Sequence, residues 1–457
     1  MGVNARIRAF TQGRMTVRFG LAATDQCVSS LSNFAVGVAV ARLAGIAALG
    51  AYSLAYVLWL VVADVHRSLI TDPMAIENDL HDPQAPRHVR IGLAAELSLG
   101  LAMALPFALG GAILLGTGQH AYGECLLALA PWLPVLLVQD YWRWVGFMKS
   151  RPGQALANDG VFGAVQTIAF LLLFFAGIRS SVLAVEAWGL GALAGACFGL
   201  VQHSVLPTLR GGVQRIRLRW SMSKWLVGES AATWGASQAY LILAGAMLGP
   251  AALGGLKAAQ SLVSGPSLVL LQAGGSVGLP EAARALKERG WPGLRRVQRV
   301  ITGAGLLSVG TIGLVVVLFG RQLLEFLYGH QFGRFGHIAD VLALSVFLGT
   351  MSLGAILSLK TTRLTKFIFR RGAISLVVSV IATVVLVPFF GLAGAASAAV
   401  ARAATSSIGC LTLHWRHSRR AAEQLGPDVG EATGVLFGAF PDLEASGLVA
   451  TFEPIAE

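Results

Sequence analysis

The chain has 457 residues, of which 55% are hydrophobic and only 13% are charged, and its net charge is +12. Soluble domains carry roughly 25% charged residues, so this composition excludes an ordinary soluble enzyme and favours a polytopic membrane protein. The 55 glycines suit close contacts between helices in lipid.

Twelve apolar segments follow one another along the chain, each long enough to cross a bilayer core of about 30 Å. They are residues 17–43, 47–70, 89–116, 121–147, 158–178, 182–208, 223–248, 251–280, 298–319, 337–359, 369–389 and 391–414. We therefore predict an all-α polytopic membrane protein with twelve transmembrane helices.

Lysine and arginine are distributed unevenly between the two sides of these segments. Of the 35 basic residues, 29 fall on the side of the N-terminus and only four on the other side: Arg42, Arg179, Arg321 and Arg334. Because cytoplasmic loops are enriched in Lys and Arg, we expect both termini in the cytoplasm. The net positive charge then reflects topology and contact with anionic lipid headgroups, and we expect no nucleic-acid partner.

Two stretches of the chain resemble each other, "LAGIAALGAYSLAYV" (43–57) and "LGPAALGGLKAAQSL" (248–262). At an offset of 204 residues, Gly45 aligns with Gly249, Gly50 with Gly254, and Asp25 with Glu229. A further match, "WGLGALAG" (188–195) with "FGLAGAAS" (390–397), has an offset of 202. The repeat predicts two pseudo-symmetric six-helix lobes related by an axis along the membrane normal, as in two-lobed transporters.

The predicted domains follow from this repeat. An N-lobe covers residues 1–209, a basic cytoplasmic linker 210–222, and a C-lobe 223–415. The remaining segment, 416–457, has seven acidic residues and three basic ones and no long apolar run. We expect it to be a mobile acidic cytoplasmic tail.

Lys257 and Arg402 are the two basic residues that fall deep inside predicted helices. Lys257 is about 12 Å along its helix from Gly249, and Arg402 is about 16 Å from Gly391. An uncompensated charge there costs ~2.5–3.5 kcal/mol on insertion scales. Either the two cations pair with a buried acid such as Glu96, or they line a wet cavity for an anionic substrate.

We favour the cationic lining, because the second lobe has no comparably deep acid that could neutralise both cations. Ser261 and Ser264 share a helix face with Lys257, and Asn33 lies on a polar face of the first predicted helix. The predicted substrate-binding residues are Lys257, Arg402, Asn33, Ser261 and Ser264. The hydroxyl and amide groups could also serve only as hydrogen bonds between helices.

Three acidic residues are candidates for coupling or gating. Asp25 and Glu229 lie near the cytoplasmic boundary of their helices, either at headgroup level or at an inner gate of the cleft. Glu96 is the only deep carboxylate in the first lobe, and it either titrates during transport or pairs with Lys257 across the cleft. We interpret Asp64, His66 and Arg67 as residues of the membrane interface rather than as a proton relay.

No catalytic or cofactor motif is present. The chain has no G-x-x-x-x-G-K-[ST] segment, which disfavours nucleotide binding of the P-loop type. It has no Ser/His/Asp or H-E-x-x-H arrangement, and its four cysteines show no metal-ligand spacing. We therefore expect neither an enzyme nor a cofactor.

Several segments resemble polysaccharide-exporting flippases, the O-antigen translocase type, of the multidrug/oligosaccharidyl-lipid/polysaccharide exporter (MOP) superfamily. They are "DQCVSSLSNFAVGVAVARLAG" (25–45), "LGPAALGGLKAAQSLVSGPSL" (248–268) with "LPEAARAL" (279–286), "LLEFLYGHQF" (323–332) and "FGLAGAASAAVARA" (390–403). The resemblance covers roughly residues 17–414 and implies a multi-pass protein of the bacterial plasma membrane. It implies that the substrate is a polyprenyl-diphosphate-linked glycan moved to the outer leaflet.

Two other functions remain open. The chain could be a cation-coupled multidrug antiporter of the same fold, using Asp25, Glu229 or Glu96, or a non-transporting membrane scaffold for glycan synthesis. The deep cations favour the flippase, because a pyrophosphate group needs positive charge whereas a cation substrate needs acids. Expected partners are the lipid-linked glycan, membrane lipids, and a glycan polymerase or glycosyltransferases.

Overall fold

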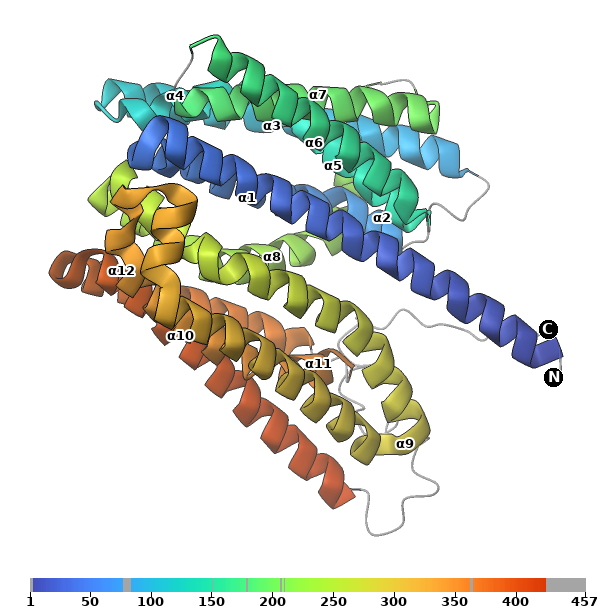
Figure 1. Ribbon diagram of the computed structural model, residues 1–457. Helices are drawn as coiled ribbons and strands as arrows, with labels where there is room; N and C mark the ends of the chain where they lie inside the picture. Colours follow the sequence, from blue (N-terminus) through green and yellow to red (C-terminus); the bar gives the residue numbers. More distant parts are fainter. Residues whose placement is uncertain are drawn as a thin grey trace.

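The computed structural model describes residues 3–76, 84–149, 151–177, 180–205, 208, 210–361 and 365–424, and the described residues form helices and short connections only. The N-lobe helices are α1 (Val3–His66), the π-helix η1 (Arg67–Thr71), α2 (Asp72–Ile76), α3 (Ala85–Gly116), α4 (His120–Leu129), the 3-10 helix η3 (Ala130–Trp132), α5 (Leu133–Met148), α6 (Pro152–Phe175) and α7 (Ser181–His203). The C-lobe helices are α8 (Gly212–Leu248), α9 (Pro250–Tyr328), the 3-10 helix η4 (His330–Phe335), α10 (Gly336–Thr350), α11 (Leu353–Thr361) and α12 (Thr365–Gln424). Figure 1 shows the two sets as separate groups of long, roughly aligned helices.

Three of the long helices bend sharply at a glycine. The backbone leaves the helical region at Gly45 in α1, at Gly290 in α9 and at Gly391 in α12. Each bend has a positive φ, which glycine adopts without the steric penalty of a Cβ atom. The two parts of each bent helix can be counted separately, and α4–α5 and α10–α11 can each be counted as one rod. The described residues then form twelve rods, which correspond to the twelve predicted spans.

Eight continuous helical segments of the described chain are long and apolar enough to cross a membrane, which agrees with the all-α membrane fold predicted from the sequence. Two of these segments, Ser32–Ala75 and Arg370–Arg416, include the bends at Gly45 and Gly391. Neither α8 nor the part of α9 before Gly290 is among the eight. Both helices contribute polar side chains to the cavity described below.

The repeated sequence adopts the same backbone conformation in both lobes. Gly45 has φ 88° and ψ −177°, and Gly249, 204 residues later, has φ 85° and ψ 178°. Each of these glycines connects the first long helix of its lobe to the second. The match "WGLGALAG" with "FGLAGAAS" is not equivalent in structure, because Gly189 lies within α7 whereas Gly391 forms the bend in α12.

The two copies of the motif also pack against each other. A Cβ atom added at Gly50 would overlap the carbonyl oxygen of Pro250, and one added at Gly254 would overlap the carbonyl oxygen of Ile46. The absence of side chains at these two positions lets the backbones of α1 and α9 approach closely, as small residues do at membrane helix contacts. The repeated glycines thus form a contact between the lobes.

Further contacts join the lobes at this same end. Tyr122 of α4 donates a hydrogen bond to the carbonyl of Gly245 in α8, at 3.0 Å. Arg42 donates to the carbonyls of Phe326 and Leu327 in the last turn of α9, where a cation is favoured by the helix dipole. The lobes also meet along α8, where Ser230 hydrogen bonds to Ser68 of η1 at 2.9 Å.

Candidate substrate cavity

A cavity of about 850 Å³ lies between the two lobes. Its walls come from α1, η1, α5, α6 and α7 on the N-lobe side and from α8, α9, α10 and α12 on the C-lobe side. A second cavity of similar volume, beside η4, is lined by C-lobe residues only and contains none of the predicted site residues. The cavity between the lobes is therefore the candidate site.

All five predicted substrate-binding residues line this cavity: Asn33, Lys257, Ser261, Ser264 and Arg402. Glu96 does not line it and is completely buried within the N-lobe. The side chains of Asp25 and Glu229 lie outside the described residues. The coupling and gating roles of these acids therefore stay predictions.

Lys257 is held by uncharged groups from both lobes. Its Nζ donates a hydrogen bond to Oε1 of Gln260 at 2.9 Å, and Gln260 in turn donates to the hydroxyl of Tyr240 at 3.0 Å. The ammonium also lies 5.7 Å from the ring centroid of Tyr56 in the N-lobe, a cation–π distance. Among the described residues, no carboxylate pairs with Lys257.

Arg402 also has no acidic partner in the described part of the chain. Its Nε is buried and makes no hydrogen bond there. A buried guanidinium donor without an acceptor is costly, and a ligand that brings acceptor oxygens would remove this cost. The C-lobe wall thus combines two uncompensated cations with the hydroxyls of Ser261 and Ser264.

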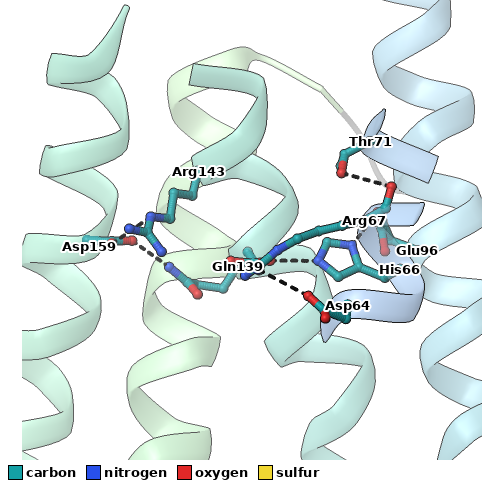
Figure 2. A network of polar contacts seen from close by, with 9 residues as sticks. Asp64, His66, Arg67, Thr71, Glu96, Gln139, Arg143 and Asp159 are labelled. Atoms are coloured by element: carbon teal, nitrogen blue, oxygen red, sulfur yellow. Dashed lines mark hydrogen bonds and ion pairs between the residues drawn. The ribbon is translucent and has the colours of Figure 1, made fainter. Parts of the chain in front are cut away.

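The N-lobe wall contains a network of charged groups (Figure 2) that the sequence analysis did not predict. His66 is fully buried. Its Nδ1 is 3.0 Å from Oε1 of Glu96, and its Nε2 is 2.6 Å from Oδ2 of Asp140. The interpretation of His66 as a residue of the membrane interface is therefore wrong, and so is the proposed pair between Glu96 and Lys257.

Two arginines connect this network to the cavity. Arg67 donates to Asp140 at 3.3 Å and lies 3.7 Å from Asp64. Arg143 pairs with Asp159 at 3.2 Å, and Asp159 also accepts a hydrogen bond from Gln139 at 2.9 Å. The N-lobe cations are thus neutralised by acids, in contrast to Lys257 and Arg402.

The sequence carried a signal for the two missed acids. Asp140 and Asp159 both lie inside apolar segments predicted to span the membrane, 121–147 and 158–178. Ionisable residues at such positions face the bundle interior and pair with one another. The statement that Glu96 is the deep acid of the first lobe is corrected, because Asp140 and Asp159 are also buried.

Aromatic side chains complete the N-lobe wall. The ring centroid of Trp188 lies 5.7 Å from that of Tyr56 and 5.7 Å from that of Trp59. Trp144 lies under the guanidinium of Arg67, at 5.3 Å. These rings give the cavity apolar surface beside its polar groups, which suits an amphipathic ligand.

No protein-family model and no curated protein sequence matches the chain. Several solved structures do match the chain in fold. A multidrug resistance MATE family transporter of the MOP superfamily, in an inward-facing conformation, aligns with a TM-score of 0.71 and 15% identity over 88% of this chain and 96% of that one. The lipid II flippase MurJ, in an inward closed conformation, aligns with a TM-score of 0.69 and 13% identity over 88% of this chain and 87% of that one.

A MOP superfamily transporter from Pyrococcus furiosus, described as having a binding pocket of reverse polarity, aligns with a TM-score of 0.61 and 16% identity over 88% of this chain and 95% of that one. These alignments cover most of both chains, and the helices of this chain follow the same path. The resemblance found in the sequence is confirmed at the level of the fold: the chain has the fold of the transporters of the MOP superfamily.

Proposed function

We propose that the protein is a flippase that moves a polyprenyl-diphosphate-linked oligosaccharide or polysaccharide precursor from the inner to the outer leaflet by alternating access. The observation that carries this proposal is the position of Lys257 and Arg402 in the cavity between the lobes, without a carboxylate partner among the described residues. A diphosphate supplies the acceptor oxygens and negative charge that both side chains lack.

The shape and chemistry of the cavity support this substrate class. A cavity of about 850 Å³ can hold a diphosphate with sugar residues next to it. Hydroxyl, amide and aromatic groups surround the cations, as a glycan headgroup requires. One solved structure of the same fold is named as a lipid II flippase, which supports a lipid-linked substrate.

The test replaces Lys257 and Arg402 by glutamine, singly and together, in the organism that makes the glycan. We expect surface glycan to fall by about tenfold or more, because a hydrogen bond to a charged group contributes about 1.5–3 kcal/mol. The lipid-linked precursor should accumulate on the inner leaflet. Its identity would also name the sugar.

The matched control is Lys224→Gln, which removes a positive charge from an exposed side chain of α8. It should leave surface glycan unchanged while the protein level stays constant. Normal glycan in both the Lys257 and the Arg402 variants would contradict the assignment of these residues.

The acid network favours a second candidate function, a cation-coupled multidrug antiporter. Glu96, Asp140 and Asp159 are buried in the N-lobe, and Asp140 and Asp159 line the cavity. An antiporter predicts efflux of a cationic dye that stops when the proton or sodium gradient is removed, and loss of efflux in Asp140→Asn. We favour the flippase because each cavity-lining acid already has a basic partner.

We also propose that the protein lies in a bacterial plasma membrane with both termini in the cytoplasm, as the distribution of Lys and Arg indicates. Reporter fusions at each terminus test this orientation. Glycosyltransferases and a glycan polymerase stay predicted partners. A scaffold for such enzymes, the third candidate, would keep its function when Lys257 and Arg402 are replaced.

A further inference from the structure

A single face of α5 forms much of the N-lobe wall of the cavity between the lobes. The opposite face of α5 packs into the N-lobe, where Tyr141 donates a hydrogen bond to the carbonyl of Val89 at 2.8 Å and Trp142 stacks on His203. The residues that line the cavity follow one another at the spacing of one helix face. This face, which we call the α5 stripe, consists of Leu136, Gln139, Asp140, Arg143, Trp144 and Phe147.

The α5 stripe places hydrogen-bonding groups beside aromatic rings. Asp159 of α6, which also lines the cavity, accepts a hydrogen bond from Gln139 at 2.9 Å and pairs with Arg143 at 3.2 Å (Figure 2). The indole Nε1 of Trp144 is buried and has no hydrogen-bond partner among the described residues. A sugar hydroxyl both donates and accepts hydrogen bonds, and an aromatic ring covers apolar surface of a ligand. The stripe therefore has the two kinds of group that a saccharide needs.

The charges that line the cavity leave none for an additional anion. Four basic and two acidic residues line it among those that the structure describes, which gives this lining a net charge of +2. Each of the two acids pairs with an arginine of the N-lobe wall, so the uncompensated charges are those of Lys257 and Arg402. A diphosphate that is esterified at both ends carries about two negative charges, one for each phosphodiester. The two C-lobe cations balance these charges.

A carboxylate on the glycan would have no free cation at the α5 stripe. It would lie beside Asp140 and Asp159, and the guanidinium of Arg143 is already bound to Asp159. Taking a carboxylate out of water without a counter-ion is strongly unfavourable. An uncharged sugar avoids this cost, because its hydroxyls bind to charged groups that already neutralise one another.

We propose that the α5 stripe, together with Asp159, is a saccharide subsite that accepts uncharged sugars and rejects sugars that carry a carboxylate. Asp159 is the specificity-determining residue, because it occupies the guanidinium that would otherwise pair with an acidic sugar. The inference rests on the proposed function, since it assigns the glycan end of the lipid-linked substrate to the N-lobe wall. It narrows the substrate to a glycan whose sugars next to the diphosphate are uncharged.

The experiment compares three esters of farnesyl diphosphate, formed with glucose, with glucuronic acid and with methanol. All three have the same lipid and the same diphosphate charge, and the two sugars differ only in the carboxylate at C6. Binding to the full chain in lipid nanodiscs is measured by isothermal titration, with empty nanodiscs as the background. Wild type should bind the glucose ester at least about tenfold more tightly than the other two, because only this ester gains hydrogen bonds without leaving a charge unpaired.

Asp159→Asn keeps the size of the side chain and frees the guanidinium of Arg143. This variant should bind the glucuronic acid ester about tenfold more tightly than wild type does, because arginine and a carboxylate form paired, charge-assisted hydrogen bonds. The preference for the glucose ester should then fall to about one to threefold. Gln139→Met removes a polar group of the stripe, so it should weaken the glucose ester about threefold or more and leave the methyl ester unchanged.

Glu186→Gln is the matched control. It removes a negative charge from the N-lobe and keeps an acceptor for the indole of Trp132, and Glu186 does not line the cavity. This variant should bind all three esters with wild-type affinity. A changed preference in Glu186→Gln would overturn the assignment of the selectivity to Asp159.

The outcomes separate this inference from the proposed function. If wild type binds none of the esters, or if Lys257→Gln and Arg402→Gln bind them as wild type does, the phosphate site of the proposed function is wrong. If binding depends on these cations but wild type does not prefer the glucose ester, only the saccharide subsite is wrong. An unchanged preference in Asp159→Asn would overturn the role of Asp159. Should that variant not fold, Gln139→Met decides, and wild-type affinity of Gln139→Met for the glucose ester would overturn the subsite.

Discussion

His66 shows how a single side chain determines the charge balance of the N-lobe. Both of its ring nitrogens face carboxylate oxygens, at 3.0 Å and 2.6 Å, so each contact needs a hydrogen between the two atoms. With two protons on the ring, the charges of His66 and Arg67 offset those of Glu96 and Asp140. A buried network with this balance avoids most of the cost of isolated charges in an apolar interior.

Replacing His66 by alanine should therefore destabilise the protein strongly. Removing one partner of a buried ionic pair costs about 3–5 kcal/mol, and here it would leave the buried Glu96 without the basic partner it has in His66. Thermal unfolding in detergent, followed by the loss of monodisperse protein, measures the effect. Unchanged thermal stability in His66→Ala would show that the carboxylates have another source of compensation.

The control for this variant is His120→Ala, since His120 is exposed at the start of α4. It should unfold at the wild-type temperature. The double variant His66→Ala/Glu96→Gln should recover part of the loss, because the carboxylate that loses its partner becomes neutral while Asp140 keeps Arg67. Such recovery separates lost charge compensation from lost packing volume.

At the scale of single elements, the sequence predicted the helices well and their connections less well. Each predicted span has a corresponding rod, because apolar segments of the length of a bilayer are a strong signal. The predicted spans place Gly290 in a loop and Gly391 at the start of a helix. In the structure, helix continues on both sides of each of these glycines. The π-helix Arg67–Thr71 had no signal in the apolar pattern.

The contact between α1 and α9 at Gly50 and Gly254 is a second feature of single elements that substitution can test. Gly50→Ala and Gly254→Ala should each lower stability by about 1–3 kcal/mol, since added atoms in a filled contact force the backbones apart. Thermal unfolding of the purified protein measures this loss. Gly110→Ala is the control, because a Cβ atom at Gly110 would meet no atom within 4 Å. Equal stability of all three variants would mean that the lobes do not depend on this contact.

At the scale of the whole molecule, the sequence predicted which side of the cavity is cationic but not how the other side is neutralised. Lys257 and Arg402 were identified because isolated basic residues in an apolar run are rare. The acid network was missed because its members, Glu96, Asp140 and His66, are distant in sequence and meet only after the N-lobe has folded. Pairings of this kind depend on tertiary packing, which one sequence does not reveal.

The repeated motif gives the last prediction, on how the lobes move. Alternating access requires that the lobes separate at the end where Gly50 meets Gly254. Ala47 and Ala251 are equivalent in the repeat and both are exposed next to this contact. Cysteines at both positions, in a chain whose four native cysteines are replaced by alanine, can be joined by a short bifunctional thiol reagent that a reductant cleaves.

Joining the two cysteines should stop glycan export almost completely, and reduction should restore it. Either single-cysteine variant, treated with the same reagent, should keep its activity, which controls for modification of one residue alone. Export is measured as lipid-linked glycan that appears on the outer side of sealed vesicles. Full export by the joined protein would mean that the substrate crosses without separation of the lobes at this end, and the rocking motion would have to be replaced by a path along a fixed groove.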